Sequence, residues 1–544
     1  MKTLNTILAP FIFLGAFLQS CTMKQNVDLI GCNGVVYTVD SAFTVAEAFA
    51  VKDGKFVAVG TTEEITGKYQ SSQIIDFKGG PVYPGLIDAH CHLWELGLNL
   101  MSADLKGCRS QEEMIERVED FYRKHPGIKA ISGAGWDQNL WPDKALPDNK
   151  LLSKAFPALP VCLTRIDGHA VLANEAAVKA MNLSVSDKGL DRTECVIKDG
   201  RFTGIFMENM CVKLKAEFSP ISQDSLPASL LAAQAECFRY GLTSVCDAEL
   251  EYPTLQALLS LAEEGSLILK VDAWPLPTGE NFQKVTKPFT LKNVKVDTYK
   301  LYRDGALGSR GSLLKEDYSD MPGRKGLEFY PLDTFRKYCT WCYEHGFRVA
   351  THCIGDAAVG SALDVYGEIL KGSNSLGWRI EHAQTVDDQD IDKFRKFSVI
   401  PSVQPTHCTS DMFWAKDRLG ARIKYAYRYK DLLDQLGWLP SGTDFPIESV
   451  NPIYTFFAAV FRKNLEFKPE NGFQMENALT KEEALRSMTI WAARSTDEEA
   501  VKGSIEPGKA ADFVTTDLDF MKAEEKQVPA TKVTGTYING QRVF

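Results

Sequence analysis

Two histidines one residue apart, His90 and His92, follow an apolar stretch at residues 84–89. Side chains alternate between the two faces of a β-strand, so we expect both imidazoles to project from the same face at the end of a strand. Paired imidazoles suit zinc and neighbouring divalent metals. Because the 544 residues contain only eight histidines, the pair indicates a metal site. Two structural histidines near a strand end are the alternative.

Further polar residues that could join this pair lie at the ends of other strand-like stretches. Lys300, His352, His382 and Asp444 each end, or lie near the end of, an apolar run. The carboxyl ends of the strands of a (β/α)8 barrel meet on one face, where active sites gather. We therefore expect these four side chains to share a site with the histidine pair. His125 and His345 lie in helical, polar surroundings and are expected at the surface.

The strands that must position these residues alternate with helical stretches, as in a parallel α/β architecture. A first strand ends at His92, and seven more are predicted at 243–247, 268–275, 296–302, 347–352, 378–382, 399–404 and 439–444. Eight strands with mostly helical connections predict a (β/α)8 TIM barrel over residues 84–499, with an insertion at about 94–240 after the first strand. Strand-like pieces at 130–136 and 161–166 within the insertion are alternative barrel strands.

Short alternating runs punctuated by glycine and aspartate characterise both chain ends. We expect residues 21–83 and 500–544 to form one composite β-domain. The formal net charge of −10 and the absence of a basic stripe argue against nucleic acid as a partner. The thirteen cysteines are scattered, several of them in apolar runs, and are expected to be buried and free. The spacing of Cys339 and Cys342 is expected to reflect helix packing, because no second such pair accompanies it.

The N-terminus has the features of an export signal. A short basic start precedes an apolar run at residues 7–18, and Leu18-Gln19-Ser20-Cys21 resembles a bacterial lipobox. The run is too short to span a bilayer, which favours a lipoprotein signal peptide at residues 1–20 over a transmembrane helix. The mature protein would then begin at Cys21 and be held at the periplasmic or cell-surface side of a membrane by its lipid alone.

An ordered series of motifs, taken together, resembles the metal-dependent amidohydrolase superfamily, in its branch of YtcJ-like and N-substituted formamide deformylase-like proteins. The motifs that carry the resemblance are PGLIDAHCHL at 84–93, GAGWDQ at 133–138, RIDGHAVLAN at 165–174, YKLYRDGALGSRGSLL at 299–314, THCIGDAA at 351–358, RIEHAQ at 379–384, SGTDFPIESVNP at 441–452 and GSIEPGKAADFVTTD at 503–517. The family fold is a metal-bearing (β/α)8 barrel beside a small β-sandwich built from both chain ends.

The resemblance also implies a role for each metal-site residue. His90, His92 and Asp444 would bind one Zn²⁺ or similar ion, and His352 and His382 a second. Lys300 would bridge both ions after carbamylation, because a free ammonium cannot ligate a cation. If Lys300 stays unmodified, a single-metal site is the alternative, and a salt bridge from Lys300 to Asp304 is another. The fallback bridging residues are Cys246, Asp247 and Glu249.

The expected reaction is hydrolysis of a carbon–nitrogen bond other than a peptide bond, in an N-acyl or N-formyl amine. A metal-activated water would attack the carbonyl carbon, with Asp444 as general base and then acid. Trp136, His169 and His407 are candidate substrate contacts. The alternatives are a cyclic amide or ester hydrolase, a deaminase, and a non-catalytic regulatory or binding lipoprotein. The expected partner is a small-molecule substrate, with a homodimer as one option for assembly.

Overall fold

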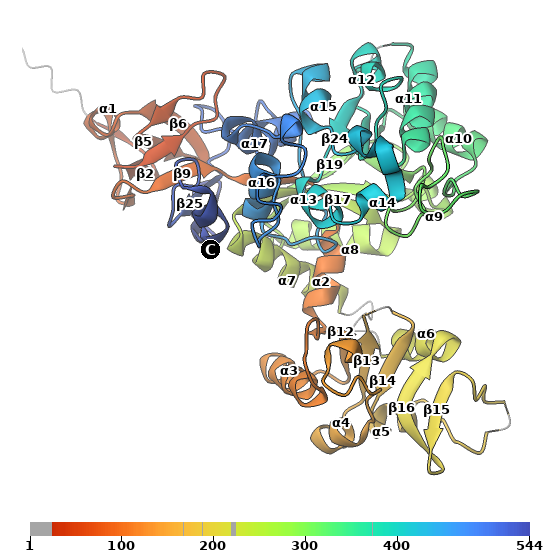
Figure 1. Cartoon of the computed structure of the whole chain (residues 1–544). Helices are drawn as coiled ribbons and strands as arrows, with labels where there is room; N and C mark the ends of the chain where they lie inside the picture. Colours follow the sequence, from red (N-terminus) through yellow and green to blue (C-terminus); the bar gives the residue numbers. More distant parts are fainter. Residues whose placement is uncertain (1–23, 167, 188, 219–224, 373) are drawn as a thin grey trace, which may run out of the picture.

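The computed structural model describes residues 24–166, 168–187, 189–218, 225–372 and 374–544 (Figure 1). The signal peptide and the lipid-bearing Cys21 that the sequence predicts lie outside these ranges. Among the residues described, no helix combines the length and the apolarity needed to cross a membrane.

Two ladders of parallel strands form the centre of the main body. The first pairs β10 (Leu86–Cys91), β17 (Leu242–Leu250), β18 (Lys270–Pro275) and β20 (Val294–Val296), with the antiparallel β19 (Phe289–Leu291) at its edge. The second pairs β21 (Thr298–Tyr302), β22 (Arg348–Cys353), β23 (Arg379–His382) and β24 (Ile400–Ser402). One residue separates β20 from β21, so the chain itself joins the ladders.

The segment predicted as an eighth strand, 439–444, returns the chain to β10. Ser441 makes one parallel bridge with Val403, and its carbonyl accepts the Ala89 N–H. Further along β10, the His90 carbonyl accepts the Asp444 N–H. The arrangement is TIM-barrel-like, with every predicted barrel strand represented by an element or, at 439–444, by this bridge.

Helices alternate with these strands because their apolar stripes need a sheet face to cover. They are α7 (Leu226–Arg239), α8 (Tyr252–Glu264), α9 (Gly279–Lys284), α10 (Leu332–Glu344), α11 (Asp356–Leu370), α12 (Ile391–Phe397), α13 (Pro405–Asp411), α14 (Ala415–Leu419), α15 (Tyr429–Leu436), α16 (Pro452–Phe461), α17 (Lys481–Ser487) and α18 (Ile490–Arg494). Cys339 and Cys342 lie on the buried face of α10. The twelve cysteines in the described ranges are all buried, as predicted, and form no disulfide with one another.

Both chain ends contribute to one β-rich region, at the left of Figure 1. A six-stranded sheet joins β3 (Val35–Tyr37), β4 (Val45–Ala46) and β9 (Pro81–Pro84) to β25 (Phe513–Thr516), β26 (Val533–Ile538) and β27 (Gln541–Arg542). A four-stranded sheet contains β2 (Leu29–Cys32), β5 (Ala48–Lys52), β6 (Lys55–Gly60) and β8 (Ile74–Asp76). Side chains of both sheets, including Phe49, Phe56 and Phe513, share one apolar cluster.

The insertion has a sheet and apolar clusters of its own and forms the lower lobe in Figure 1. Its strands are β11 (Ala103–Asp104), β12 (Ile131–Trp136), β13 (Val161–Arg165), β14 (Ala170–Ala173), β15 (Cys195–Lys198) and β16 (Arg201–Met207). The pieces at 130–136 and 161–166 therefore pair here and not in the barrel-like ladders. The helix α2 (Leu93–Leu100) belongs with the main body, because it packs against α7.

Candidate metal centre

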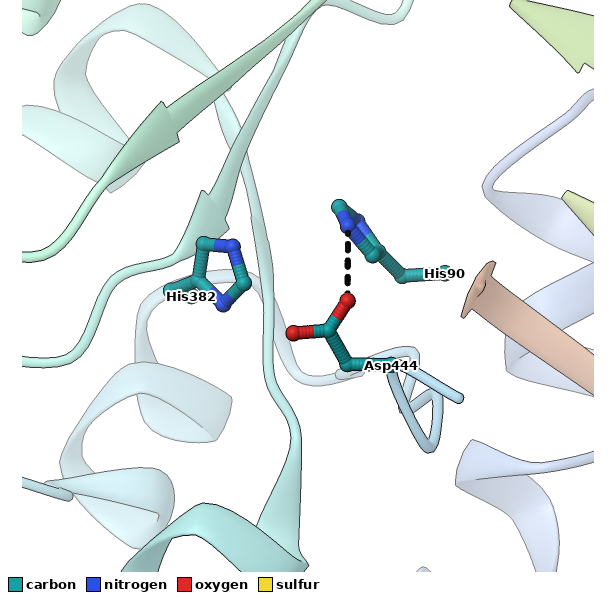
Figure 2. A group of neighbouring side chains, drawn as sticks. All are labelled: His90, His382 and Asp444. Carbon is teal, nitrogen blue, oxygen red and sulfur yellow. Dashed lines mark ion pairs between the residues drawn. The ribbon is translucent and has the colours of Figure 1, made fainter. Parts of the chain in front are cut away.

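The histidine pair lies where β10 passes into α2. His90 is fully buried near the end of β10, and His92 is the residue that precedes the first turn of α2. The Nε2 atoms of His90 and His92 lie 3.5 and 3.1 Å from Oδ1 of Asp444. Figure 2 shows the His90–Asp444 pair with His382 beside it. The tertiary fold thus brings the end of the segment 439–444 next to the end of β10.

The other predicted ligands converge on the same point from β21, β22 and β23. Nζ of the fully buried Lys300 lies 3.1 Å from Nε2 of His90. The ring centroid of His382 lies 5.1 Å from that of His90 and 4.5 Å from that of His352. All six predicted metal-site residues therefore meet at one end of the parallel strands.

Lys300 does not take the alternative partner that the sequence left open, because Asp304 is engaged elsewhere. One oxygen of Asp304 accepts the N–H groups of Leu313 and Gly355, and the other accepts that of Ile354. These bonds tie the loop after β21 to the loop after β22. Asp304 thus has a structural role beside the site.

A cavity of about 390 Å³ opens onto this cluster. Its lining contains five of the six predicted residues, all except His90, together with Tyr302, Leu307, Ile354, Trp414 and the acidic side chains Glu95, Glu249 and Asp411. The lining thus combines apolar and aromatic side chains with carboxylates. Such a mixture of apolar surface and few convergent polar groups is typical of small-molecule sites.

Three residues of this cavity have left-handed backbone conformations. Glu249, His382 and Asp444 have φ angles of 72°, 69° and 61°. This conformation costs a residue with a Cβ about 1–2 kcal/mol. Such strain persists only where the surrounding structure imposes it, and it concentrates at functional sites.

Burial holds three of the four predicted imidazole ligands in their neutral form. It lowers the pKa of His90 to about 4, that of His352 to about 3, and that of His382 well below its usual value. For His92, burial is outweighed by the contact with Asp444, which raises the pKa. Burial likewise lowers the pKa of Lys300. Neutral imidazoles have a free lone pair for a metal, and a less basic lysine is more readily converted to a carbamate.

Asp444 remains ionised in spite of its burial. Burial alone would raise its pKa, but the hydrogen bond with His407 and the contact with His92 outweigh this and hold the pKa well below its usual range. Oδ2 of Asp444 lies 2.9 Å from Nε2 of His407, a predicted substrate contact on α13. Although burial opposes it, contact with Asp444 and Glu448 raises the pKa of His407 to about 10.

These residues fit a divalent ion. Buried ligand atoms that make no hydrogen bond within the described residues include Nε2 of His352, Nδ1 of His382 and Oδ1 of Asp444. Native proteins rarely leave such atoms unsatisfied. The separations of 3.1 and 3.5 Å between Oδ1 of Asp444 and the two imidazole nitrogens also match the spacing of about 3.4 Å between ligand atoms of a tetrahedral zinc ion.

Two predicted substrate contacts lie away from this cavity. Trp136 is fully buried in the core of the insertion, where its indole N–H donates to the Leu163 carbonyl. His169 is exposed on the same lobe, beside Glu208. The expectation that both are substrate contacts is corrected for this cavity, because the insertion packs around its own sheet and buries Trp136 in that core.

The sequence reasoning assigned no role to Glu381, which contacts the cluster directly. Oε2 of Glu381 lies 2.5 Å from Nδ1 of His90. Arg379 and Glu381 lie two residues apart on β23, so strand alternation could have placed both on its inner face. Alternation does not predict which residue of another strand they contact, which here is His90 of β10.

This fold and site define the class of protein, since solved metal-dependent hydrolases share the architecture. The structure of an uncharacterized metal-dependent hydrolase from Pyrococcus horikoshii OT3 superimposes with a TM-score of 0.74 at 29% identity, covering 91% of this chain and 99% of the other. A second, from Pyrococcus furiosus, gives the same TM-score over 91% and 100% of the two chains. The protein is a metal-dependent hydrolase.

The chain belongs to the amidohydrolase family, whose model matches residues 73–544. It is 29% identical to the putative amidohydrolase YtcJ of Bacillus subtilis over 94% of this chain and 98% of that protein. It is 28% identical to the protein LONG AFTER FAR-RED 3 of Arabidopsis thaliana, over 97% and 94%. It is 23% identical to the N-substituted formamide deformylase of Arthrobacter pascens, over 95% and 98%. These similarities place it in the YtcJ-like branch.

Proposed function

We propose that the protein hydrolyses an exocyclic amide bond of an N-acyl or N-formyl amine, with Asp444 as the general base. The observation that carries the proposal is the position of Asp444, which lines the cavity with Oδ1 toward the histidine pair and Oδ2 held by His407. The similarity to a formamide deformylase along nearly the whole chain supports this bond type.

We infer that His90, His92 and Asp444 would hold one Zn²⁺ ion and that His352 and His382 would hold a second, with Lys300 as a further ligand once it is carbamylated. Divalent ions held here would lower the pKa of a water and polarise the substrate carbonyl. Asp444 accepts the proton of the attacking water and delivers it to the departing nitrogen. His407 keeps the carboxylate from rotating during both transfers, because it holds Oδ2.

The lining of the cavity favours an uncharged or cationic substrate. Among the described lining residues there is no arginine, and Lys300 is the single lysine. Enzymes that bind a carboxylate usually present arginine in a bidentate geometry. With Glu95, Glu249 and Asp411 also present, an N-acyl amine fits this cavity better than an N-acyl amino acid.

We further infer the finer architecture and the location of the protein. The parallel ladders, joined through residues 296–298 and through Ser441, support a closed eight-stranded barrel over 84–499. The shared apolar cluster supports a β-sandwich built from 21–83 and 500–544. The lipobox-like residues 18–21 support export as a lipoprotein anchored through Cys21.

The test combines metal analysis with a substrate panel. Purified protein is analysed for bound metal and then assayed with formamides, N-acyl amino acids, hydantoins, lactones and aminated heterocycles. We expect about one or two Zn²⁺ per chain and the fastest turnover with neutral N-formyl or N-acyl amines. Preferred turnover of a hydantoin or lactone would favour the cyclic amide or ester reaction, and ammonia release from a heterocycle would favour deamination. No turnover by metal-loaded protein across the panel would favour a non-catalytic binding role.

A further inference from the structure

Glu381 lies beside His90 and is not among the residues that line the cavity. Oε2 of Glu381 and Nδ1 of His90 are 2.5 Å apart, and both side chains are fully buried. Resting on the metal centre proposed above, we propose that Glu381 is a positioning residue that fixes the orientation and the tautomer of His90 for metal binding. Arg379 holds Glu381 in place.

The contact with Glu381 defines the tautomer of His90. An ionised carboxylate has acceptor atoms only, so Nδ1 of His90, 2.5 Å from Oε2 of Glu381, carries the proton and donates it. Nε2 then keeps its lone pair and points to the other metal-site residues, 3.1 Å from Nζ of Lys300. A metal ion would use the same Nε2 lone pair that Lys300 faces here.

Arg379 connects Glu381 to the backbone next to His90. Its Nε donates to Oε1 of Glu381 at 2.5 Å, and its Nη2 donates to Oε2 at 3.2 Å. The same Nη2 donates to the Ala89 carbonyl, in the residue that precedes His90, and to the Ser402 hydroxyl. The guanidinium therefore fixes the carboxylate relative to β10, β23 and β24 together.

The second histidine of the pair is held less firmly. Nδ1 of His92 lies 3.4 Å from Oε2 of Glu249, whose side chain is 35% exposed at the cavity. Nδ1 of His92 makes no hydrogen bond within the described residues. A buried carboxylate with a bidentate arginine thus supports His90, whereas His92 faces a carboxylate that is only partly buried. Carboxylates behind metal-binding histidines fix the tautomer and raise the basicity of the ligand.

A substitution by glutamine exploits this geometry. Arg379 only donates, so the amide oxygen of a glutamine at 381 would face Arg379 and its NH₂ group would face His90. Nδ1 would then accept, the proton would move to Nε2, and the lone pair for the metal would be lost. The volume of the side chain hardly changes, so the variant reports on the tautomer and not on packing.

The matched control is another buried arginine–carboxylate pair, formed by Arg348 at the start of β22 and Asp297 between β20 and β21. Asp297 accepts from Nε of Arg348 at 3.0 Å, and the two side chains are only 14% and 8% exposed. Neither contacts a predicted metal ligand. Asp297→Asn therefore reproduces the loss of a buried ion pair without touching the histidines.

The experiment measures Zn²⁺ affinity by chelator competition and records the visible spectrum of the Co²⁺-loaded protein. We expect Glu381→Gln to weaken Zn²⁺ binding about 10–100-fold and to alter the Co²⁺ spectrum. Glu381→Asp, which keeps an acceptor, should recover part of the affinity, and Asp297→Asn should stay within about threefold of the wild type. If Glu381→Gln does not fold, the Zn²⁺ affinities of Glu381→Asp and Asp297→Asn are compared instead. A loss in Glu381→Asp no larger than that in Asp297→Asn would then overturn the proposal.

Zn²⁺ affinity and a Co²⁺ spectrum unchanged in Glu381→Gln would overturn the proposal. An equal loss of affinity in Asp297→Asn would also overturn it, since that result would reflect general destabilisation. No substrate enters these measurements, so a failure of the proposed amide hydrolysis leaves this test intact. Conversely, normal amide hydrolysis by a Glu381→Gln variant with unchanged metal affinity would remove the positioning role and leave the proposed function standing.

Discussion

Asp444 divides its two oxygens between different neighbours. Oδ1 lies beside the Nε2 atoms of His90 and His92, and Oδ2 lies beside Nε2 of His407. The sequence predicted Asp444 and both histidines of the pair, because strand-end position and alternation are local properties. It named His407 only as a polar contact near the barrel mouth. Its contact with Asp444 depends on where α13 packs, which local patterns do not encode.

The first prediction concerns Asp444→Asn. An amide cannot accept the proton of the attacking water, so we expect kcat to fall about 10²–10⁴-fold while the protein still folds and keeps at least one metal ion. Steady-state kinetics, metal analysis and circular dichroism check this. Asp411→Asn is the control, because Asp411 lines the same cavity but accepts from Tyr427 and Gln384. Near-normal turnover by Asp444→Asn would remove it from the mechanism.

The second prediction uses Asp272, a fully buried residue of β18 whose two oxygens make no hydrogen bond within the described residues. Burial raises its pKa to about 7, from about 3.9 in an unfolded chain. The neutral form is therefore favoured by folding. The stabilisation that protonated Asp272 gives the folded state is fully present below about pH 4 and is lost as the pH rises through about 7.

Asp272→Asn removes the charge at every pH. We expect the thermal midpoint of the variant minus that of the wild type to increase as the pH rises from 5 to about 7. Above that pH the difference should stay constant. Thermal unfolding at a series of pH values checks this. The exposed Asp434→Asn serves as the control and should show no such trend. A difference for Asp272→Asn that is independent of pH would contradict the assignment.

At the scale of elements, the junction of β10 with residues 441–444 determines the geometry of the site. Asp88 on β10 accepts from the backbone and the hydroxyl of Thr443, and the Asp444 N–H donates to the His90 carbonyl at 2.8 Å. Gly442 permits this approach, because a Cβ there would lie 2.4 Å from N of His90. The sequence predicted a strand at 439–444, but the structure has a single bridge there, since the chain turns toward His90.

The third prediction is that Gly442→Ala separates these segments. The added methyl group should destabilise the fold by about 1–3 kcal/mol and weaken metal binding, because Asp444 would move away from the histidines. Thermal unfolding and metal titration measure both effects. Gly67→Ala is the control, since a Cβ there meets nothing within 4 Å and lies in the helix α1 (Thr62–Lys68). Wild-type metal affinity in Gly442→Ala would show that the close approach is not needed.

At the scale of the whole molecule, the cavity belongs to the main body, and the insertion forms a lobe with its own cores. The sequence identified the insertion as extra to the barrel but did not place it. Its strands pair with one another, so they bury their apolar faces without the barrel. Trp136 therefore packs within the lobe, whereas Trp414, on the loop between α13 and α14, lines the cavity.

The fourth prediction compares these two locations. We expect His169→Ala to keep kcat/KM within about twofold of the wild type, because His169 lies on the surface of the lobe. Trp414→Ala should raise KM about tenfold or more, since it removes an aromatic wall of the cavity. Kinetics with the best substrate of the panel measure both. A large loss in His169→Ala would mean that the lobe reaches the cavity during turnover.

The sequence alone determined which residue types could bind a metal and that each lies near the end of a strand. It could do so because alternation and apolar runs are local features of the chain. The tertiary structure decided which of these side chains meet and what supports them. Glu381 is 291 positions from His90, and only the tertiary fold, which brings β23 and β10 to the same site, puts Oε2 of Glu381 2.5 Å from Nδ1 of His90. Contacts over such distances depend on how the strands close around the site, which no local pattern specifies.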